Sequence, residues 1–306
     1  MKNLLSTKEV SRYLRVNEKM VYTLISEKGL PASKITGKWV FPQHLVDQWI
    51  EANTQNMPAA DRTEFAAAGL LIVAGSNDPL LEQTITLFNG HYPDCLAVFG
   101  NLGSMGGIRA LKQGLCKMAT SHLLQAEGDE YNFEFLGQGF VPPPVVVNFC
   151  MRRQGLIVAK GNPKKIQTTA DLRKPGVRVV NRKLGTGTRL LFDRELKAAQ
   201  LDGNRLAGYD SEVARHMDVG LAVLMGKADA GPGIQPVAEQ LGLDFIPWRW
   251  ERYDLLIQKE HFFEPAIQQF LGMLHETQFH HLVSDYDGYD LSTSGRMIFP
   301  KTPKQN

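Results

Sequence analysis

The sequence predicts a mixed α/β fold, in which a small segment of short helices precedes a larger region of two α/β lobes. Residues 1–50 contain two short helical patterns, a tight turn and a basic hairpin. Residues 66–300 instead alternate apolar strands with helices that open on Gly, Ser or Thr. The chain has 306 residues, enough for two or three domains, and its 43% of hydrophobic residues can form buried cores.

Positive charge is concentrated at the start of the chain, although the whole chain carries only +2. Residues 1–56 hold eight basic and five acidic residues, whereas the rest holds 26 basic and 27 acidic ones. A positive segment of this kind suits a phosphate backbone. We see no signal peptide and no apolar run long enough to span a membrane, and the three cysteines have no metal or redox spacing. We therefore expect a cytoplasmic protein with free thiols.

The first segment predicts two helices joined by a three-residue turn. Ser6 or Thr7 is suited to cap the first helix, and Asn17 the second. Residues 29–31, Gly-Leu-Pro, end the second helix. Residues 34–41 alternate around a glycine and predict a two-stranded wing, after which a third helix begins at position 42. Two such helices form a helix-turn-helix, whose second helix enters the major groove of DNA.

The segments LLSTKEVSRYLRVNEKMVYTLI, GLPASKI and GKWVFPQHLVDQWI, which cover most of residues 3–51, resemble the excisionase-type, MerR-like winged helix-turn-helix family. The resemblance implies binding to double-stranded DNA, and a winged helix that binds protein is the alternative. Family members often have Arg where this chain has Thr23, so one head is expected to bind weakly and the protein to act as a homodimer. The residues expected to face DNA are Asn17, Lys19, Tyr22, Thr23, Lys34 and Lys38.

Composition also indicates the domain limits. The residues after the third helix are polar with a single proline and predict a linker, with a helical dimerisation segment as the alternative. The expected limits are 1–54 for the DNA-binding domain, 55–66 for the linker and 67–300 for the ligand-binding domain, with lobe 1 at about 67–150 and 252–300 and lobe 2 at about 156–250.

The larger region begins with a repeated strand–helix pattern. Its first strands and helices are expected at residues 70–74, 80–88, 95–99, 105–113 and near 117–120. This β-α-β-α-β order predicts a parallel sheet with right-handed crossovers. A second lobe follows, with elements expected at 141–149, 156–159, 177–180, 185–196, 213–225, 228–230 and 245–247, before 252–257 and 265–275 return to the first lobe.

Six segments within residues 69–275 resemble the type II periplasmic-binding-protein fold. The closer resemblance is to the form that is fused to helix-turn-helix heads and related to molybdate-binding proteins. The segments are GSMGGIRAL, HLL…DEYN, RRQGLIVAKGNP, VVNRKLGTGTRLLFD, GKADAGPGI and LGLDFIPWRWERYDLLI. Together with the head, the resemblance implies a ligand-responsive transcriptional regulator that senses a molybdate- or tungstate-like oxyanion between its lobes. A small-ligand carrier whose head docks a protein partner is the alternative.

Three expected helix starts carry hydroxyl groups: Ser76, Ser104, and Thr186 with Thr188. In open α/β sheets ligands bind beyond the carboxyl ends of the strands, where helix N-termini offer free N–H groups and a partial positive charge. Three of them meeting at one cleft would suit a tetrahedral oxyanion. Simple helix capping is the alternative for each hydroxyl. By the resemblance, Ser76 and Ser104 match serines that molybdate receptors use.

Other residues extend this candidate site. Asn181 and Arg182 end a strand of the opposite lobe, and an arginine there could pair with a carboxylate or phosphate instead. Residues 231–234 read Gly-Pro-Gly-Ile where molybdate receptors often supply a tyrosine, so a different oxyanion or a small organic molecule stays open. The expected ligand-binding residues are Ser76, Asn77, Ser104, Met105, Asn181, Thr186, Thr188, Arg189 and Gly233.

Catalytic and metal motifs are not apparent. His122, Asp129 and Tyr131 could face the cleft, although a lone histidine is more often structural. The pair His280-His281 near two aspartates has a faint metal pattern, for which a solvated loop is the alternative. We find no Ser-His-Asp order, nucleophile elbow or Walker loop. We therefore expect a binding protein without a cofactor or metal rather than an enzyme.

Overall fold

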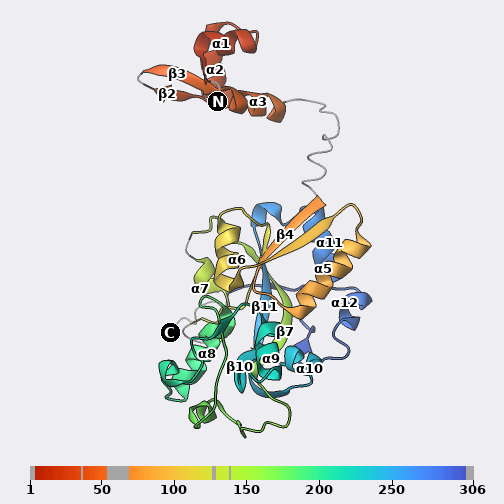
Figure 1. The fold of residues 1–306 in the computed structure, drawn as a ribbon. Helices are drawn as coiled ribbons and strands as arrows, with labels where there is room; N and C mark the ends of the chain where they lie inside the picture. The colour runs from red at the N-terminus through yellow and green to blue at the C-terminus, as the bar shows by residue number, and fades with distance from the viewer. Residues whose placement is uncertain (1–3, 36, 54–68, 126–128, 138, 301–306) are drawn as a thin grey trace, which may run out of the picture. The chain divides into compact units, whose positions relative to one another are not determined.

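The structure is a computed structural model that describes residues 4–35, 37–53, 69–125, 129–137 and 139–300. The chain divides into two compact units, Met1–Glu64 and Phe65–Asn306 (Figure 1). The predicted linker, residues 55–66, lies outside the described residues, so the domain limits stay predictions. Within the described ranges, no helix is long and apolar enough to cross a membrane.

The first unit combines a helix-turn-helix with a small sheet. Its antiparallel strands follow the order β1-β3-β2, so the predicted two-stranded wing gains a third strand from the N-terminus. The elements are β1 (Leu4–Ser6), α1 (Thr7–Tyr13), α2 (Glu18–Lys28), β2 (Ser33–Ile35), β3 (Lys38–Pro42) and α3 (Gln43–Ala52). Their shared core consists of Val10, Val21, Leu30, Phe41 and Val46.

The predicted caps begin and end the helices of the first unit. The Ser6 hydroxyl accepts from the Glu9 N–H, and the Glu9 carboxylate accepts from the Ser6 N–H at 2.7 Å, which forms a capping box on α1. Asn17 caps α2 by accepting from the Met20 N–H at 2.8 Å. Gly29 ends α2 with a φ of 66°, a left-handed conformation that glycine adopts readily.

The second unit is built on one eight-stranded sheet. The main strand order is β10-β7-β11-β6-β4-β5, and β4 runs parallel to both β5 and β6 as predicted. Two short strands, β8 and β9, pair separately. The strands are β4 (Leu70–Gly75), β5 (Leu96–Asn101), β6 (Met118–Ser121), β7 (Val145–Val158), β8 (Asn181–Arg182), β9 (Glu212–Val213), β10 (Ala230–Ile234), β11 (Asp244–Ile257), β12 (Tyr289–Asp290) and β13 (Met297–Ile298).

Helices cover both faces of this sheet in each lobe. In the first lobe α5 and α11 pack on one face and α6 on the other (Figure 1). In the second lobe α8 packs on one face and α9 with α10 on the other. The helices are α5 (Pro79–His91), α6 (Gly103–Lys112), α7 (Phe133–Leu136), α8 (Gly187–Ala198), α9 (His216–Leu224), α10 (Gln235–Gln240), α11 (Pro265–Met273) and α12 (Thr277–His281), with short 3-10 turns η1 (Thr169–Arg173), η2 (Gly203–Arg205) and η3 (Lys259–His261).

Strands β7 and β11 run through both lobes as an antiparallel pair. The start of β7 lies in the core of the first lobe, with Val147, and its end lies in the core of the second lobe, with Ile157. The prediction of two separate strands for each of these segments was wrong. The middle of the pair carries the polar residues Arg152, Gln154 and Glu251, which interrupt the apolar pattern but are buried and contact one another.

Two predicted elements of the second lobe also differ. The helix expected from residue 213 begins at His216, because Glu212 and Val213 pair with β8. The strand expected at residues 177–180 is reduced to isolated bridges at Arg178 and Val179, and the regular pairing falls on the two residues of β8.

Candidate functional site

The residues predicted to contact DNA lie on the surface of the first unit. They come from α2 and its cap and from the two wing strands. The cap residue Asn17 uses its side-chain oxygen for the Met20 N–H, which leaves its amide N–H₂ as the group available for DNA. The exposed residues are Asn17, Lys19, Tyr22, Lys34 and Lys38, and Thr23 is half-buried.

In the second unit, four polar side chains lie at strand ends and helix starts. Ser76 directly follows β4 and His122 directly follows β6, so these neighbouring parallel strands bring both to the same edge of the sheet. Ser104 lies in the first turn of α6, and Thr188 in the first turn of α8 in the other lobe. All four residues are buried, with at most 1% of their surface exposed.

The two lobes touch where α6 and α8 begin. The Met105 N–H of α6 donates to the Gly185 carbonyl before α8 at 3.2 Å. The backbone of Gly187 lies against His122, because a Cβ added at Gly187 would be 2.6 Å from the His122 Cε1 atom. Glycine at this position therefore allows the lobes to approach closely.

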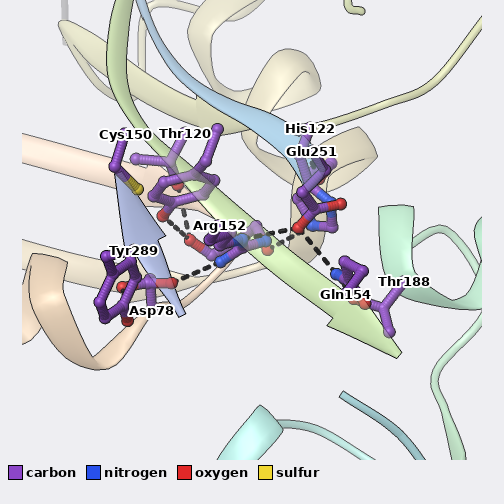
Figure 2. Close-up of polar contacts among 12 residues, drawn as sticks. Asp78, Thr120, His122, Cys150, Arg152, Gln154, Thr188, Glu251 and Tyr289 are labelled. Atoms are coloured by element: carbon purple, nitrogen blue, oxygen red, sulfur yellow. Dashed lines mark hydrogen bonds and ion pairs between the residues drawn. The ribbon is translucent and has the colours of Figure 1, made fainter. Parts of the chain in front are cut away.

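A buried line of ion pairs and hydrogen bonds extends behind Ser76. Arg152 of β7 bridges two carboxylates, with Nη1 2.6 Å from Asp78 Oδ2 and Nε 2.6 Å from Glu251 Oε1 (Figure 2). The second oxygen of Glu251, Oε2, lies 2.9 Å from Nδ1 of His122. Nε2 of His122 lies 3.0 Å from the Oγ of Ser76.

The combined effect of burial and neighbouring charges lowers the pKa values of both Glu251 and His122, so that Glu251 is ionised and His122 is neutral. Burial alone would raise the pKa of Glu251, but His122 and Arg152 outweigh it and lower that pKa to about 2. Burial lowers the pKa of His122, and Arg152 and Arg182 lower it further against the opposing effect of Glu251. At neutral pH the pair is therefore an ionised carboxylate beside a neutral imidazole.

The order of hydroxyl, imidazole and carboxylate in Ser76, His122 and Glu251 also occurs in serine hydrolases, where it activates the serine. Sequence patterns do not reveal this order, because 46 positions separate Ser76 from His122, and 129 separate His122 from Glu251. No local motif connects residues so far apart. Its detection required the pairing of β11 with β6 and β7, which brings Glu251 to the end of β6.

Gln154 connects this line to the second lobe. Its Nε2 donates to Oε1 of Glu251 at 2.7 Å and to the Oγ1 of Thr188 at 3.1 Å (Figure 2). The carboxylate can only accept, so it fixes which end of the Gln154 amide faces it. Thr188 therefore accepts a hydrogen bond, and its own hydroxyl hydrogen stays available.

Arg182, at the end of β8, contributes a buried positive charge. Its Nη2 donates to the Oδ1 of Asn77 at 3.3 Å. Its Nε and Nη1 have no hydrogen-bond partner among the described residues, although the side chain is fully buried. Burial and the nearby charge of Arg152 lower the pKa of Arg182 to about 9, against the opposing charge of Asp218. A buried guanidinium with open N–H groups is costly unless a negative group meets it.

His216, the first residue of α9, lies beside the same cluster. Its ring centroid is 6.5 Å from that of His122, and neither ring nitrogen has a partner in the described part of the chain. Burial, Arg182 and Arg152 together hold the pKa of His216 well below its usual range. This part of the molecule thus combines the buried cations Arg152 and Arg182 with the carboxylates of Asp78 and Glu251 and with two imidazoles whose pKa values are lowered.

A cavity of about 560 Å³ lies beside the cluster. Asn77 lines this cavity and also contacts Arg182, although Arg182 itself is not among the lining residues. Its walls come from α5 of the first lobe and α9 and α10 of the second, and they include Pro79, Glu82, Met217 and Gln240.

The polar groups of Thr186 and Arg189, two predicted ligand residues, already have hydrogen-bond or ion-pair partners within the second lobe. Thr186 caps α8 by accepting from the Arg189 N–H at 3.3 Å, and its hydroxyl donates to the Lys183 carbonyl at 2.8 Å. The Arg189 guanidinium pairs with Asp193 at 3.1 Å and with Glu212 at 2.9 Å. The capping alternative therefore describes Thr186, and Arg189 is held by two carboxylates of the second lobe.

Asn181 and Gly233 also take structural positions. The Asn181 side chain donates to the Tyr209 carbonyl at 3.1 Å. Gly233 pairs with Gly155 inside the sheet, and a Cβ on it would be 2.5 Å from the Cδ1 of Ile157. The structure thus gathers Ser76, Asn77, Ser104, Met105 and Thr188 around the meeting point of the lobes. Thr186 also lies there, against Gly103, but its hydroxyl is occupied, whereas Asn181, Arg189 and Gly233 make their contacts within the second lobe.

Some polar residues at the meeting point were absent from the sequence prediction. Arg152, Gln154 and Glu251 lie within strands, where a polar residue normally indicates solvent exposure. His216 had no signal, because it is one of eight histidines and follows no motif. The sequence predicts Arg182 at the end of a strand, and the structure adds that its side chain is buried with two nitrogens lacking partners among the described residues.

The remaining candidates lie elsewhere. Asp129 pairs with Arg249 at 2.5 Å, and Tyr131 is buried beneath the guanidinium of Arg252. His280 and His281 are exposed at the end of α12. Among the described residues, no group of three or more His, Cys, Asp or Glu side chains is placed to hold a metal ion.

The fold and the cleft define a class of protein, a helix-turn-helix domain joined to a two-lobed binding domain. Residues 85–275 match the family described as PBP superfamily domain, and residues 4–54 match a helix-turn-helix domain. The chain belongs to the PBP superfamily and carries an excisionase-like head at its N-terminus. These findings confirm the predicted fold class, with its helix-turn-helix domain and its PBP-like domain, whereas the relation to molybdate-binding proteins stays a prediction.

Three similar proteins illustrate the match. A Bacillus subtilis (strain 168) protein named "Uncharacterized protein YvgK" is 27% identical over 95% of this chain and 96% of its own length. A Clostridium pasteurianum protein encoded in the 5′ region of a 2Fe-2S ferredoxin gene is 30% identical over 36% of this chain and 97% of its own. A solved Clostridium perfringens protein, assigned as a phosphate transporter substrate-binding protein with bound phosphate, is 15% identical, with a TM-score of 0.54 over 76% of this chain and all of its own.

The similarity to the solved structure concerns the fold alone. Both matched domains are binding domains rather than enzyme domains. A helix-turn-helix joined to a PBP-like domain fits a DNA-binding regulator with a ligand-binding domain.

Proposed function

We propose that this protein is a ligand-responsive transcriptional regulator that binds a small tetrahedral oxyanion, of the molybdate or tungstate type, between the lobes of its second unit. The observation that carries the proposal is Arg182, which is fully buried next to Asn77 and whose Nε and Nη1 atoms have no hydrogen-bond partner in the described part of the chain. A cleft that binds an apolar molecule would not need a buried arginine. A buried charge of this kind is stabilised by an anion.

The hydroxyl groups near Arg182 support an oxyanion in particular. Ser104 and Thr188 come from the first turns of α6 and α8, where free N–H groups and the helix dipole favour negative charge. Ser76 adds a third hydroxyl from the end of β4. Three hydroxyls and a guanidinium from both lobes suit an anion with several equivalent oxygens better than an apolar molecule.

Such an anion would link the two lobes. Ser76 and Ser104 belong to the first lobe and Thr188 and Arg182 to the second, so a ligand that contacts both sets favours the closed arrangement seen here. A ligand shifts a conformational equilibrium only by its preference for one state. We propose that this preference changes the spacing of two heads in a cytoplasmic homodimer and thereby the affinity for DNA.

Isothermal titration of the full chain with molybdate, tungstate, sulfate and phosphate tests the ligand part of the proposal. We expect saturable binding of at least one of these ions and none of chloride. Binding of an uncharged sugar or a cation in their place would contradict the oxyanion assignment. A gel shift with the DNA upstream of the gene tests the regulator part, and a head that docks a protein instead would give no salt-sensitive shift.

A further inference from the structure

The three hydroxyls of the proposed site are not equivalent in their hydrogen bonding. The Oγ of Ser104 accepts from the His122 backbone N–H at 3.4 Å, and the Oγ1 of Thr188 accepts from Gln154 at 3.1 Å. Each of these hydroxyls therefore keeps its own hydrogen for a ligand. Ser76 differs, because its Oγ faces the ring nitrogen Nε2 of His122.

The direction of the bond between Ser76 and His122 follows from Glu251. An ionised carboxylate only accepts, so Nδ1 of His122 carries a hydrogen towards Glu251 Oε2. In a neutral imidazole the other nitrogen, Nε2, is then an acceptor. Ser76 must give its hydroxyl hydrogen to Nε2, and its oxygen can only accept from anything else.

An oxyanion without its own hydrogen cannot use Ser76 in this state. Molybdate, tungstate and sulfate have only acceptor oxygens, so a Ser76 that also only accepts would repel them. If His122 takes up a proton on Nε2, it donates to Ser76, and the Ser76 hydroxyl hydrogen turns to the ligand. A hydrogen phosphate ion, which keeps one O–H, can instead donate to Ser76 while His122 stays neutral.

We propose that His122 is a specificity-determining residue that acts through Ser76, and that it takes up one proton whenever an oxyanion with only acceptor oxygens binds in the cleft. This inference rests on the proposed function, because it requires the ligand to contact Ser76. It divides the possible ligands into two chemical classes by whether they bring a hydrogen of their own.

The charges around His122 favour its protonation when an anionic ligand binds. Arg152 and Arg182 oppose a positive His122, and Glu251 favours it, so the charge of an incoming anion offsets the two arginines. Thr188 and Gly187 of α8 bring no charge towards the ring. The titratable or charged groups that face His122 are Glu251 and Tyr253 of β11, Arg152 of β7, Arg182 of β8 and His216 of α9.

Calorimetry in two buffers of different ionisation enthalpy measures the proton directly. With the full wild-type chain and molybdate at about pH 8, well above the ordinary range of histidine, the heats should differ by an uptake close to one proton. The affinity should fall by up to tenfold for each further pH unit. Equal heats in the two buffers, with clear binding, would overturn the inference and leave the proposed function standing.

Two variants identify the residue that takes the proton. His122→Gln should bind molybdate more weakly and without a buffer-dependent heat, whereas His216→Gln should keep the buffer-dependent heat. The reverse pattern would assign the proton to His216 and refute the role of His122. A purely structural role of His122 would lower the affinity but would leave the proton uptake of the remaining binding unchanged.

A measurement on the wild-type chain covers the case in which His122→Gln does not fold. At about pH 8 phosphate is mostly the monoprotonated ion, so its binding should take up fewer protons than that of molybdate. Equal uptake for both ions would contradict the inference. If molybdate, tungstate, sulfate and phosphate all give no heat, the proposed site itself is wrong and the inference falls with it.

Discussion

The guanidinium of Arg182 reaches the side chain of Asn77 across the meeting point of the two lobes, with 3.3 Å between Nη2 and Oδ1. Asn77 follows β4 in the first lobe, and Arg182 ends β8 in the second. The remaining N–H groups of Arg182, on Nε and Nη1, are those that have no partner among the described residues. The contact therefore places a donor set from one lobe beside the serines of the other.

Replacing Arg182 should weaken ligand binding without destabilising the ligand-free fold. Arg182→Met removes open N–H groups that the ligand would use, and charge-assisted hydrogen bonds of this kind contribute about 1.5–3 kcal/mol, or roughly tenfold to a hundredfold in affinity. It also removes an incompletely paired buried charge, so the free energy of unfolding without ligand should stay equal or rise. Calorimetry and urea unfolding measure the two effects. Arg205→Met, at an exposed arginine, is the control and should change neither.

Removing Arg152 should have the opposite effect on stability. Arg152→Met leaves the carboxylates of Asp78 and Glu251 buried without their common partner. Breaking a buried pair in this way costs about 3–5 kcal/mol. We expect a clearly lower midpoint in urea unfolding of the full chain, followed by tryptophan fluorescence. A midpoint equal to that of the wild type would show that the ion pairs contribute little.

The low pKa of Glu251 predicts a specific acid dependence. Its pKa is lowered from an ordinary value of 4.5 to about 2 in the folded chain, so its contribution is present above pH 4.5 and is lost as the pH falls towards 2. The difference in unfolding free energy between the wild type and Glu251→Gln should therefore shrink over this range. Urea unfolding at a series of pH values measures it, and a constant difference would contradict the ionised state of Glu251.

A methyl group at Gly187 should hinder the approach of the lobes. The added Cβ would lie 2.6 Å from the His122 Cε1 atom and 2.9 Å from its carbonyl oxygen. Gly187→Ala should therefore reduce oxyanion affinity by about tenfold or more and increase the radius of gyration of the liganded chain in X-ray scattering. The matched control is Gly90→Ala in α5, where an added Cβ meets nothing within 4 Å.

The wing lysines should contribute to DNA binding through phosphate contacts. Lys34→Ala and Lys38→Ala remove exposed charges of β2 and β3. Each should lower the slope of log affinity against log salt by about one, without changing the preferred sequence. Fluorescence anisotropy with the upstream DNA at several salt concentrations measures the slope. Lys227→Ala, at an exposed lysine of the second unit, should leave it unchanged.

Hydrophobic periodicity correctly predicted the helices and strands whose polar residues face solvent, but not those that bury polar residues. The strand β4, the helix α5 and the caps Ser6 and Asn17 follow from local patterns. The long strands β7 and β11 do not, because buried residues such as Arg152 and Glu251, 99 positions apart, satisfy each other's charge. A local window cannot recognise a polar residue whose partner is that distant.

Local sequence predicted some residues of the candidate site and could not predict others. The position of strand ends was sufficient to single out Ser76, Ser104 and Thr188, which the structure gathers around His122 and Gln154. The sequence could not separate caps from open hydroxyls, and so it included Thr186 and Arg189. That distinction depends on which groups are already occupied, which is a property of the folded chain.

The strands β7 and β11 both connect the lobes and carry the charges behind the serine and the histidine. Arg152 and Glu251 therefore lie midway along the two strands that a change in the angle between the lobes would have to bend. Substitutions at these positions that change the proposed ligand preference should therefore also change how readily the two strands bend.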